Sequence, residues 1–481
     1  MQKTSRRGTT RRTIVAVAAA ALAMVGVLAA AAPASAAPGN MPTGNGTLTI
    51  HKFEQPATSG AANDSGAPLS SATTSSWVAL SGVTFTVQRI TSVDLQTNAG
   101  WDAASGYAAS PSTIPAGSLG AASSVTTGTS GAVSSTLPIG AYLVTEVASP
   151  AAKLPDGSPA HITMTAAPFV VTVPIPTTAG TWNTDVHVYP KNSLSAVAKS
   201  VAAPSGLGLG ATLTWTIDVK IPFLTAGDSF SDFDVTDVLD AKLQYVAGSA
   251  TASVAGTAVA VTDTTSGQNV ALSPALSALA AHQGKTISFS FSTKVVAAGA
   301  VVNQASAFIN DPNHTNGITS NQATTYWGSI LITKHTEGDA AKTLEGAVFG
   351  VYTSEADALA DTNRVSVNGA DEFRTGADGT VRIPGLFVSN TPGQTKVYYV
   401  HELTAPAGYD LNETAFAVTL TADGQVATPV AQSVADPQKP AFELPITGGD
   451  GARTLLFLGG GLLLVALGVA IVAMRRRSAQ R

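Results

Sequence analysis

The chain has 481 residues, with 26 Lys or Arg against 31 Asp or Glu, so its net charge at pH 7 is only mildly acidic. Most arginines lie near the two ends, which leaves no basic face for nucleic acid. The absence of cysteine excludes disulfides and a thiol nucleophile, and the seven histidines supply no metal-ligand cluster in the sequence.

Residues 1–36 have the order of a secretory signal peptide. Arginines at positions 6, 7, 11 and 12 precede an apolar run over 14–32, and Ala34-Ser35-Ala36 is a small-residue cleavage site. The twin arginines also suggest the twin-arginine export route, but no Phe-Leu-Lys follows them, which favours the general secretory route. We therefore expect an exported protein whose mature chain begins near Ala37.

The span between the two ends is rich in Val, Thr, Ala, Gly and Ser and has no extended amphipathic helical period. Runs at 213–219, 286–293 and 397–403 alternate apolar and polar residues or are β-branched, and Gly, Pro, Asn and Asp separate such runs. This pattern predicts an all-β chain of tandem immunoglobulin-like sandwiches. The length allows two to four such domains.

An internal repeat relates the start and the end of this span. Residues 46–52 (Gly-Thr-Leu-Thr-Ile-His-Lys) align with 328–334 (Gly-Ser-Ile-Leu-Ile-Thr-Lys), and a Tyr-x-Val-x-Glu box occurs at 142–146 and again at 398–402. The order of the two segments is the same in both copies. We infer two homologous β domains that flank a different one.

Strand alternation directs several charged residues of these repeats toward the core. Lys52 shares a strand face with Leu48 and Ile50, and Glu146 shares one with Tyr142 and Val144. Lys334 and Glu402 occupy the equivalent positions in the second copy, and Lys199, Asp237 and Asn303 lie on apolar strand faces between the copies. A buried lysine or carboxylate is costly unless it is paired or chemically altered.

A buried lysine beside a carboxyl group has a chemical use. Desolvation lowers the pKa of the amine and raises that of the acid, so the pair can exist as a neutral nucleophile and a protonated acid. An Asn held beside them could then be attacked, with loss of ammonia and formation of an isopeptide bond. The alternative is an edge lysine that extends to solvent and a surface glutamate.

The C-terminal end combines three elements. The pentapeptide Leu444-Pro445-Ile446-Thr447-Gly448 is followed by an apolar run over 454–474 and then by three arginines, 475–477. The run is long enough to cross a membrane, which needs roughly 20 apolar residues, and the arginines favour a cytoplasmic end. A single-pass membrane protein with a chance pentapeptide is the alternative.

The tail resembles the cell-wall sorting signal of Gram-positive surface proteins, in which sortase cleaves after the threonine. A second motif resembles the pilin motif of sortase-assembled backbone pilins of Gram-positive pili, and it consists of Trp182, Val186, Val188, Tyr189, Pro190, Lys191 and Asn192. The resemblance covers essentially the whole chain. It implies a structural subunit, not an enzyme, in which the Lys191 amine receives the Thr447 carbonyl of the next copy. A wall-anchored, non-polymerising adhesin that binds a host ligand is the alternative, and only polymerisation needs Lys191.

The resemblance also implies a domain order. A signal peptide (1–36) precedes a Cna-B-like domain (37–192) that ends in the pilin motif, a Cna-A-like middle domain (193–328) and a Cna-B-type domain (329–441). The sorting signal (442–481) follows, with a membrane segment at 454–474. The implied location is a pilus on the cell surface, anchored to peptidoglycan.

The same resemblance assigns roles to the core lysines. In the middle domain Lys199 would join Asn303 with help from Asp237. Asp234 is the alternative candidate for the assisting acid, and Asn321 is the alternative candidate for the acceptor. In the last domain Lys334 and Glu402 match the family's lysine and assisting acid. Asp436 stands where the family usually has an acceptor Asn, so the bond would release water. In the first domain Lys52 would join Asn192 with help from Glu146.

Other expectations concern partners and weaker signals. The implied partners are identical subunits, a pilus sortase, a housekeeping sortase, tip or base pilins and peptidoglycan, with a host surface ligand as a further candidate. No cofactor is expected, although Asn310, Asp311, Asn313 and Asn316 offer oxygen ligands for calcium as an alternative to a polar turn. The Gly-Leu-Gly-Leu-Gly run at 206–210 is expected to be a turn. Small polar stretches at 55–76 and 103–132 are expected to be solvated loops.

Overall fold

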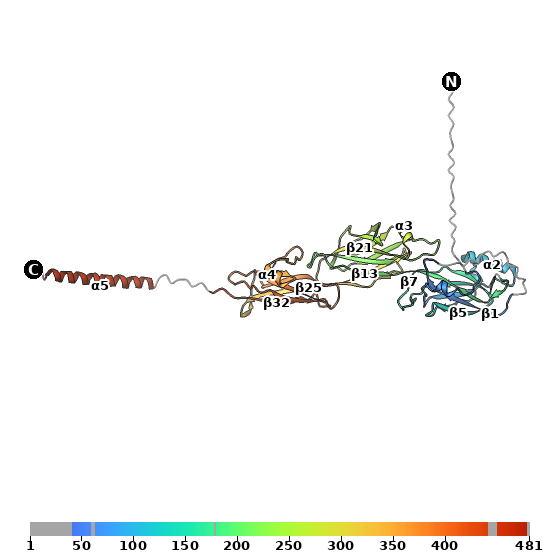
Figure 1. The fold of residues 1–481 in the computed structure, drawn as a ribbon, viewed down its shortest axis with the longest axis horizontal. Helices are drawn as coiled ribbons and strands as arrows, with labels where there is room; N and C mark the ends of the chain where they lie inside the picture. The colour runs from blue at the N-terminus through green and yellow to red at the C-terminus, as the bar shows by residue number, and fades with distance from the viewer. Residues whose placement is uncertain (1–40, 59–62, 178, 441–449, 479–481) are drawn as a thin grey trace, which may run out of the picture.

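The computed structural model describes residues 41–58, 63–177, 179–440 and 450–478, the last with side chains at 454–475 only. The expected signal peptide and the pentapeptide 444–448 lie outside these residues. The described β-strands form three successive groups along one long axis (Figure 1), so the chain is mostly β and contains several sandwiches. The prediction of several β-sandwiches is therefore confirmed, although the described chain is mostly β and not all-β, because it also contains helices such as α2 (Asn98–Ala109) and α5 (Asp450–Ser478).

The first group of strands contains three small sheets and a two-stranded pairing of β9 (Ile175–Pro176) with β10 (Trp182–Asn183). Strand β1 (Asn45–His51) lies between β11 (Asp185–Val188), to which it is parallel, and β5 (Ala132–Pro138), to which it is antiparallel. The second sheet has the order β4 (Ser123–Thr126), β3 (Thr84–Arg89), β6 (Gly140–Glu146) and β8 (Phe169–Val173). The third has the order β2 (Phe53–Glu54), β12 (Lys191–Ser195) and β7 (His161–Met164). Leu48 and Ile50 of β1 and Phe85 and Val87 of β3 share one core.

A helical insertion covers the far side of the second sheet in this first sandwich. Helix α2 (Asn98–Ala109) begins after Thr97, whose hydroxyl accepts a hydrogen bond from the Gly100 amide at 3.0 Å. Its Ala104 and Ala108 are buried in a separate small core. The stretch 103–132 is therefore not simply a solvated loop. The remaining short elements are α1 (Ser71–Thr74), η1 (Pro111–Thr113) and η2 (Ala116–Ser118).

The middle group is a sandwich of two larger sheets. One contains β13 (Val197–Val201), β14 (Thr212–Lys220), β21 (Thr286–Val295), β17 (Thr251–Val254) and β18 (Thr257–Val259), with β16 (Leu243–Tyr245) also on β21. The other contains β19 (Val261–Asp263), β20 (Asn269–Pro274), β15 (Phe233–Val238), β23 (Ala305–Ile309) and β24 (Ile318–Thr319). Alternation along β14 buries Leu213, Trp215, Ile217 and Val219 between them. Helices α3 (Leu276–Leu279) and η3 (Ala280–His282) lie in a connection.

The last group repeats the two-sheet plan. One sheet contains β22 (Gly299–Asn303), β25 (Ala323–Thr336), β26 (Asp339–Thr343), β29 (Thr380–Ser389) and β32 (Val430–Asp436). The other has the order β28 (Phe373–Arg374), β27 (Val348–Tyr352), β30 (Thr395–Thr404) and β31 (Phe416–Thr421), with helix α4 (Glu355–Ala360) beside it.

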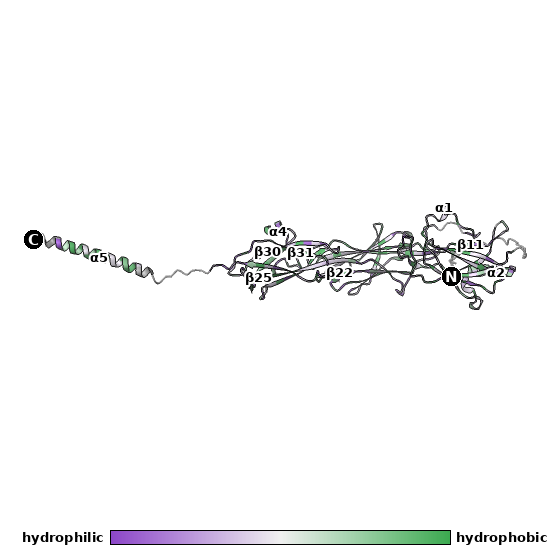
Figure 2. Cartoon of the chain, turned by 90° about the horizontal axis from the view of Figure 1, so that it is seen from below, coloured by the Kyte–Doolittle hydropathy of each residue, from purple (hydrophilic) through white to green (hydrophobic). Residues whose placement is uncertain are grey.

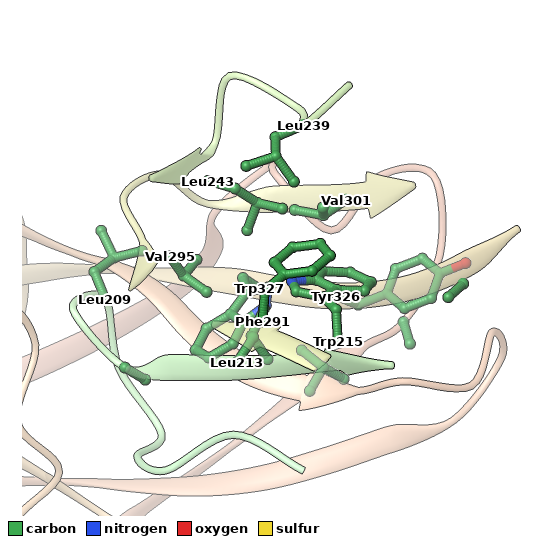
Figure 3. Packing of buried hydrophobic residues seen from close by; sticks show 14 of the residues in the cluster. Leu209, Leu213, Trp215, Leu239, Leu243, Phe291, Val295, Val301, Tyr326 and Trp327 are labelled. Carbon is green, nitrogen blue, oxygen red and sulfur yellow. The ribbon is translucent and has the colours of Figure 1, made fainter. Parts of the chain in front are cut away.

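Strand β25 passes without interruption from the middle group into the last. Its first part pairs with β22, and its later part pairs with β29 and β32. One hydrophobic cluster follows it across the junction, and Figure 3 shows Leu209, Phe291 and Trp327 packed within that cluster. The 328/329 division therefore falls inside a continuous strand.

The run at 206–210 forms part of this junction. The Leu207 and Leu209 carbonyls accept hydrogen bonds from the amides of Phe387 and Asn368 at 2.8 and 2.7 Å. The Leu209 side chain packs directly on the backbone of Gly385, which has a φ of +65° and no space for a Cβ atom. This segment is a turn, as expected, and it fastens the middle sandwich to the last.

The junction between the first and middle groups is more polar. Strand β12 continues three residues beyond Asn192, to Ser195, and pairs with β7 of the first group. The Ser195 hydroxyl donates to the Lys220 carbonyl at 2.5 Å, and the Lys220 amine pairs with Glu54 at 2.5 Å. The first strand group therefore ends slightly later than the sequence suggests.

The described chain ends in helix α5 (Asp450–Ser478). Its segment Thr454–Arg475 is long and apolar enough to cross a membrane, by length and composition. Figure 2 shows hydrophobic residues along this helix. The helix is consistent with the membrane element of a sorting signal.

Candidate functional site

The first buried lysine lies between a glutamate and an asparagine. The Lys52 amine donates hydrogen bonds to Glu146 Oε2 at 2.7 Å and to Asn192 Oδ1 at 2.5 Å, and Asn192 Nδ2 donates to Glu146 Oε1 at 2.5 Å. Lys52 directly follows β1, Glu146 ends β6, and Asn192 is the second residue of β12. The side chains of Lys52 and Glu146 are fully buried, and burial lowers the pKa of Lys52 to about 8.

The middle sandwich brings Lys199, Asp237 and Asn303 together from three strands. The Lys199 amine donates to Asp237 Oδ2, and Asn303 Nδ2 donates to the same oxygen at 3.3 Å. Burial lowers the pKa of Lys199 and raises that of Asp237, although their mutual attraction acts against both shifts. Trp215 and Phe291 flank the amine, each with its ring centroid 5.1 Å away.

The two competing residues lie elsewhere. Asp234 accepts a hydrogen bond from Ser273 at 2.5 Å and contacts His314 at 3.0 Å. Asn321 pairs with the backbone of Lys199, accepting from its amide and donating to its carbonyl at 2.9 Å each. The Lys199 amine therefore faces Asp237, with Asn303 beside it.

The last sandwich contains one lysine between two acids. The Lys334 amine donates to Glu402 Oε2 at 2.9 Å and to Asp436 Oδ1, and all three side chains are fully buried. Strand β25 carries the lysine and runs parallel to β32, which ends at Asp436. Burial, opposed by the lysine, raises the pKa of Glu402 to about 7. Among the described residues, Glu402 Oε1 and Asp436 Oδ2 have no hydrogen-bond partner.

The three clusters share one chemical capability. Each holds a lysine amine beside a carbonyl or carboxyl group that could be attacked, and beside an acid that could transfer protons. Aromatic and aliphatic core residues exclude water from each cluster, which strengthens the electrostatic interactions within it. Such an arrangement suits one intramolecular condensation per cluster.

The motif at 182–192 runs through β10 and β11 to the start of β12 in the first sandwich. Trp182 packs against Trp101 of α2 with ring centroids 5.6 Å apart, and Val186 is fully buried. The ring of Tyr189 stacks on His51 at 4.7 Å, and its hydroxyl accepts a hydrogen bond from the Leu69 amide at 2.7 Å. Val188 ends β11, two residues before Pro190 and three residues before the start of β12.

Lys191 is the first residue of β12 and is half-buried rather than freely exposed. Its amine donates to the Tyr189 carbonyl at 3.2 Å and lies 4.4 Å from the ring centroid of Trp77. Burial lowers the pKa of Lys191. Sequence analysis did not anticipate Trp77, whose only signal was a tryptophan at the end of a small polar stretch.

Two other predicted sites have different outcomes. Thr447 and the rest of the pentapeptide, Leu444, Pro445, Ile446 and Gly448, lie outside the described residues. In the 310–316 loop both carboxylate oxygens of Asp311 accept hydrogen bonds, from Thr315 at 2.8 Å and from the Asn316 amide at 2.6 Å. Within the described chain no group of three or more His, Cys, Asp or Glu residues could hold a metal ion.

Comparison with known proteins identifies the family. Residues 43–193 match the model of the Gram-positive pilin subunit D1 N-terminal domain, and residues 328–433 match a prealbumin-like fold domain. The chain is 30% identical to the type 2 fimbrial subunit of Actinomyces naeslundii, over 97% of this chain and 96% of that one. The chain belongs to the fimbrial subunits of Gram-positive bacteria. The type 1 fimbrial subunit of Actinomyces viscosus is similar at 29% identity, over 95% of this chain and 96% of that one.

A solved structure supports the fold of this fimbrial subunit. The full-length major pilin SpaD from Corynebacterium diphtheriae superposes with a TM-score of 0.66 at 23% identity, over 84% of this chain and 99% of that one. As a member of the fimbrial subunits, this chain is a structural protein of a cell-surface pilus and not an enzyme.

Proposed function

We propose that this fimbrial subunit is the polymerising shaft subunit of a covalent pilus. Sortase would join the Thr447 carbonyl of one copy to the Lys191 amine of the next. The observation that carries the proposal is the setting of Lys191: it directly precedes the last residue of the pilin motif, begins the central strand of the β2–β12–β7 sheet, and holds a half-buried amine that no carboxylate pairs with among the described residues.

The linkage would proceed by two acyl transfers. A sortase thiolate attacks the Thr447 carbonyl, the Thr447–Gly448 bond breaks, and the glycine leaves as an amine. The neutral Lys191 amine of the neighbouring subunit then attacks the acyl-enzyme, forms the amide and releases the thiolate. Helix α5 would hold the precursor at the membrane until cleavage, and a housekeeping sortase would transfer the finished polymer to peptidoglycan.

The three buried clusters would become internal isopeptide bonds. The amines of Lys52 and Lys199 would attack the side-chain amides of Asn192 and Asn303, each releasing ammonia. Lys334 would attack the carboxyl group of Asp436 and release water. Glu146, Asp237 and Glu402 would transfer the protons, a role supported by their contacts with the lysines.

These bonds suit a fibre under tension. Force entering at Lys191 would pass along the chain to Thr447, through a middle Cna-A-like domain and a last Cna-B-type domain. The Lys199–Asn303 and Lys334–Asp436 bonds would each transmit the force directly, so that most of the strands between the two bonded residues would not be stretched. The first Cna-B-like domain precedes Lys191, so its bond would instead anchor that domain beside the linkage.

Replacement of Lys191 tests the function directly. Lys191→Ala should abolish the ladder of detergent-resistant polymers from cell walls and leave monomers, because the acyl-enzyme lacks its acceptor. The matched control is Lys153→Ala, which removes an exposed lysine from the same sandwich and should leave the ladder intact. A full ladder in the Lys191→Ala strain would contradict the shaft assignment and favour a wall-anchored monomer.

A further inference from the structure

Trp77 reaches the acceptor lysine from a distant part of the chain. It lies between β2 and β3, at the end of a turn in which the Trp77 amide donates a hydrogen bond to the Thr74 carbonyl at 3.0 Å. The next residue, Val78, accepts a hydrogen bond from the Glu54 amide at 2.8 Å, which fastens this segment to β2. Backbone hydrogen bonds before and after Trp77 therefore hold the main chain that carries the indole.

Aromatic neighbours fix the orientation of the indole. Phe53 meets it edge-on with ring centroids 5.3 Å apart, and Tyr189 does so at 6.4 Å, both at 75°. Tyr189 is itself held by the ring of His51 and by the Leu69 amide. The indole face toward Lys191 is thus set by groups from four segments of the first sandwich.

We propose that Trp77 is a positioning residue for acyl transfer to Lys191. Its face holds the amine on one side while the Tyr189 carbonyl accepts one of its hydrogens, so the flexible lysine side chain is presented in a restricted orientation. The inference rests on the proposed function, since it concerns the same acceptor amine. Lysine has a large rotamer entropy, and restricting the side chain beforehand reduces the entropy lost during transfer.

Two effects of the indole on the amine oppose each other. A cation–π contact favours the ammonium form, whereas exclusion of water favours the neutral amine that attacks. The net pKa of Lys191 is lowered by burial. The positive charge of Lys191 in turn helps to lower the pKa of Lys52, and in the described part of the chain no carboxylate lies within 4 Å of the Lys191 amine to oppose the effect of burial.

The test uses the full chain expressed with its sortase. Trp77→Ala should slow ladder formation about tenfold, the order expected when lysine rotamer freedom is restored, and Trp77→Phe should retain most of the rate. The pH profile of Lys191 acylation by an N-hydroxysuccinimide ester, measured by peptide mass spectrometry with Lys153 as the reference, should move to higher pH in Trp77→Ala. Trp77→Leu preserves bulk without the aromatic face and should resemble Trp77→Ala.

The outcomes separate this inference from the function on which it rests. Wild-type ladder rates and pH profiles in Trp77→Ala, or faster transfer in that variant, would overturn the positioning role. In both cases Lys191→Ala would still abolish the ladder. Persistence of the ladder in Lys191→Ala would instead overturn the shaft function itself. If Trp77→Ala fails to fold, the contrast between Trp77→Phe and Trp77→Leu decides the question.

Discussion

The first and last lysine clusters share a lysine and a glutamate at equivalent strand positions but differ in the third residue. In the first cluster Asn192 contacts both Lys52 and Glu146, so one carboxylate is shared by two donors. In the last cluster Asp436 takes the place of the amide, and a single amine lies between two acids. The difference changes the number of protons that the core must hold.

One proton transfer makes the first cluster neutral, because a lysine and one acid become an amine and a carboxylic acid. The last cluster would keep one uncompensated negative charge if both of its acids were ionised, and a fully buried charge of this kind is costly. The raised pKa of Glu402, about 7, is consistent with an extra proton held there. An acid acceptor therefore makes bond formation depend on protonation in a way that an amide acceptor does not.

Loss of the acceptor in the last cluster should have the largest effect. Asp436→Ala leaves Lys334 paired with Glu402 but removes the cross-link, which would close a loop of about 100 residues. By analogy with disulfides, the free energy of unfolding should fall by about 5 kcal/mol, because the denatured chain regains its loop entropy. Urea denaturation of the last sandwich measures the change.

Intact mass provides the internal check on this variant. The wild-type chain should lack two molecules of ammonia and one of water, and Asp436→Ala should recover only the water deficit. Asp410→Ala is the matched control, since it removes an exposed aspartate of the same sandwich. Equal stabilities of Asp436→Ala and Asp410→Ala would show that no bond forms at this site.

The sequence predicted much of these clusters because the strands obey a simple alternation. Lys52 and Lys334 each lie two residues beyond buried isoleucines on the same strand face, so their burial follows from a period of two. The acceptors Asn192 and Asp436 could not be derived in this way, because their contacts depend on which distant strands pair. They came from family resemblance.

Other features depend on tertiary contacts that leave little trace in the sequence. Helix α2 has many small residues and only a weak apolar face, so its segment looked like a loop until packing against the second sheet buried Ala104 and Ala108. Continuity of β25 across the junction depends on pairing with β22 on one side and β32 on the other. Trp77 meets Lys191 only because a turn returns the chain to β2.

The two clusters should respond to pH in opposite directions. Lys52, with a pKa of about 8, becomes a neutral nucleophile as pH rises through that value, so the first bond should form faster. Glu402, with a pKa of about 7, loses its proton as pH rises, so the last bond should form more slowly above pH 7. For the measurement, chain from cell-free synthesis is transferred at once into denaturant and then diluted into buffers of different pH. The masses of the cross-linked peptides are followed over time.

A variant of the acid checks the origin of the pH effect. Glu402→Gln keeps the size of the side chain but does not titrate, so its residual rate at the last site should not fall near pH 7. The first site in the same molecule serves as an unaltered reference. Parallel pH profiles at the two wild-type sites would contradict the distinction between amide and acid acceptors.

The smallest effect on stability should come from converting one acceptor into the other. Attack of Lys334 on an Asp side chain with loss of water, and attack on an Asn side chain with loss of ammonia, give the same amide product. Wild type and Asp436→Asn should therefore mature into molecules of identical covalent structure, with equal mass and indistinguishable unfolding free energies. The route should still differ, because the last cluster of the variant contains a single acid, as the first does, and should lose the added proton requirement. Unequal mature masses or stabilities would show that one of the two chains does not form the bond.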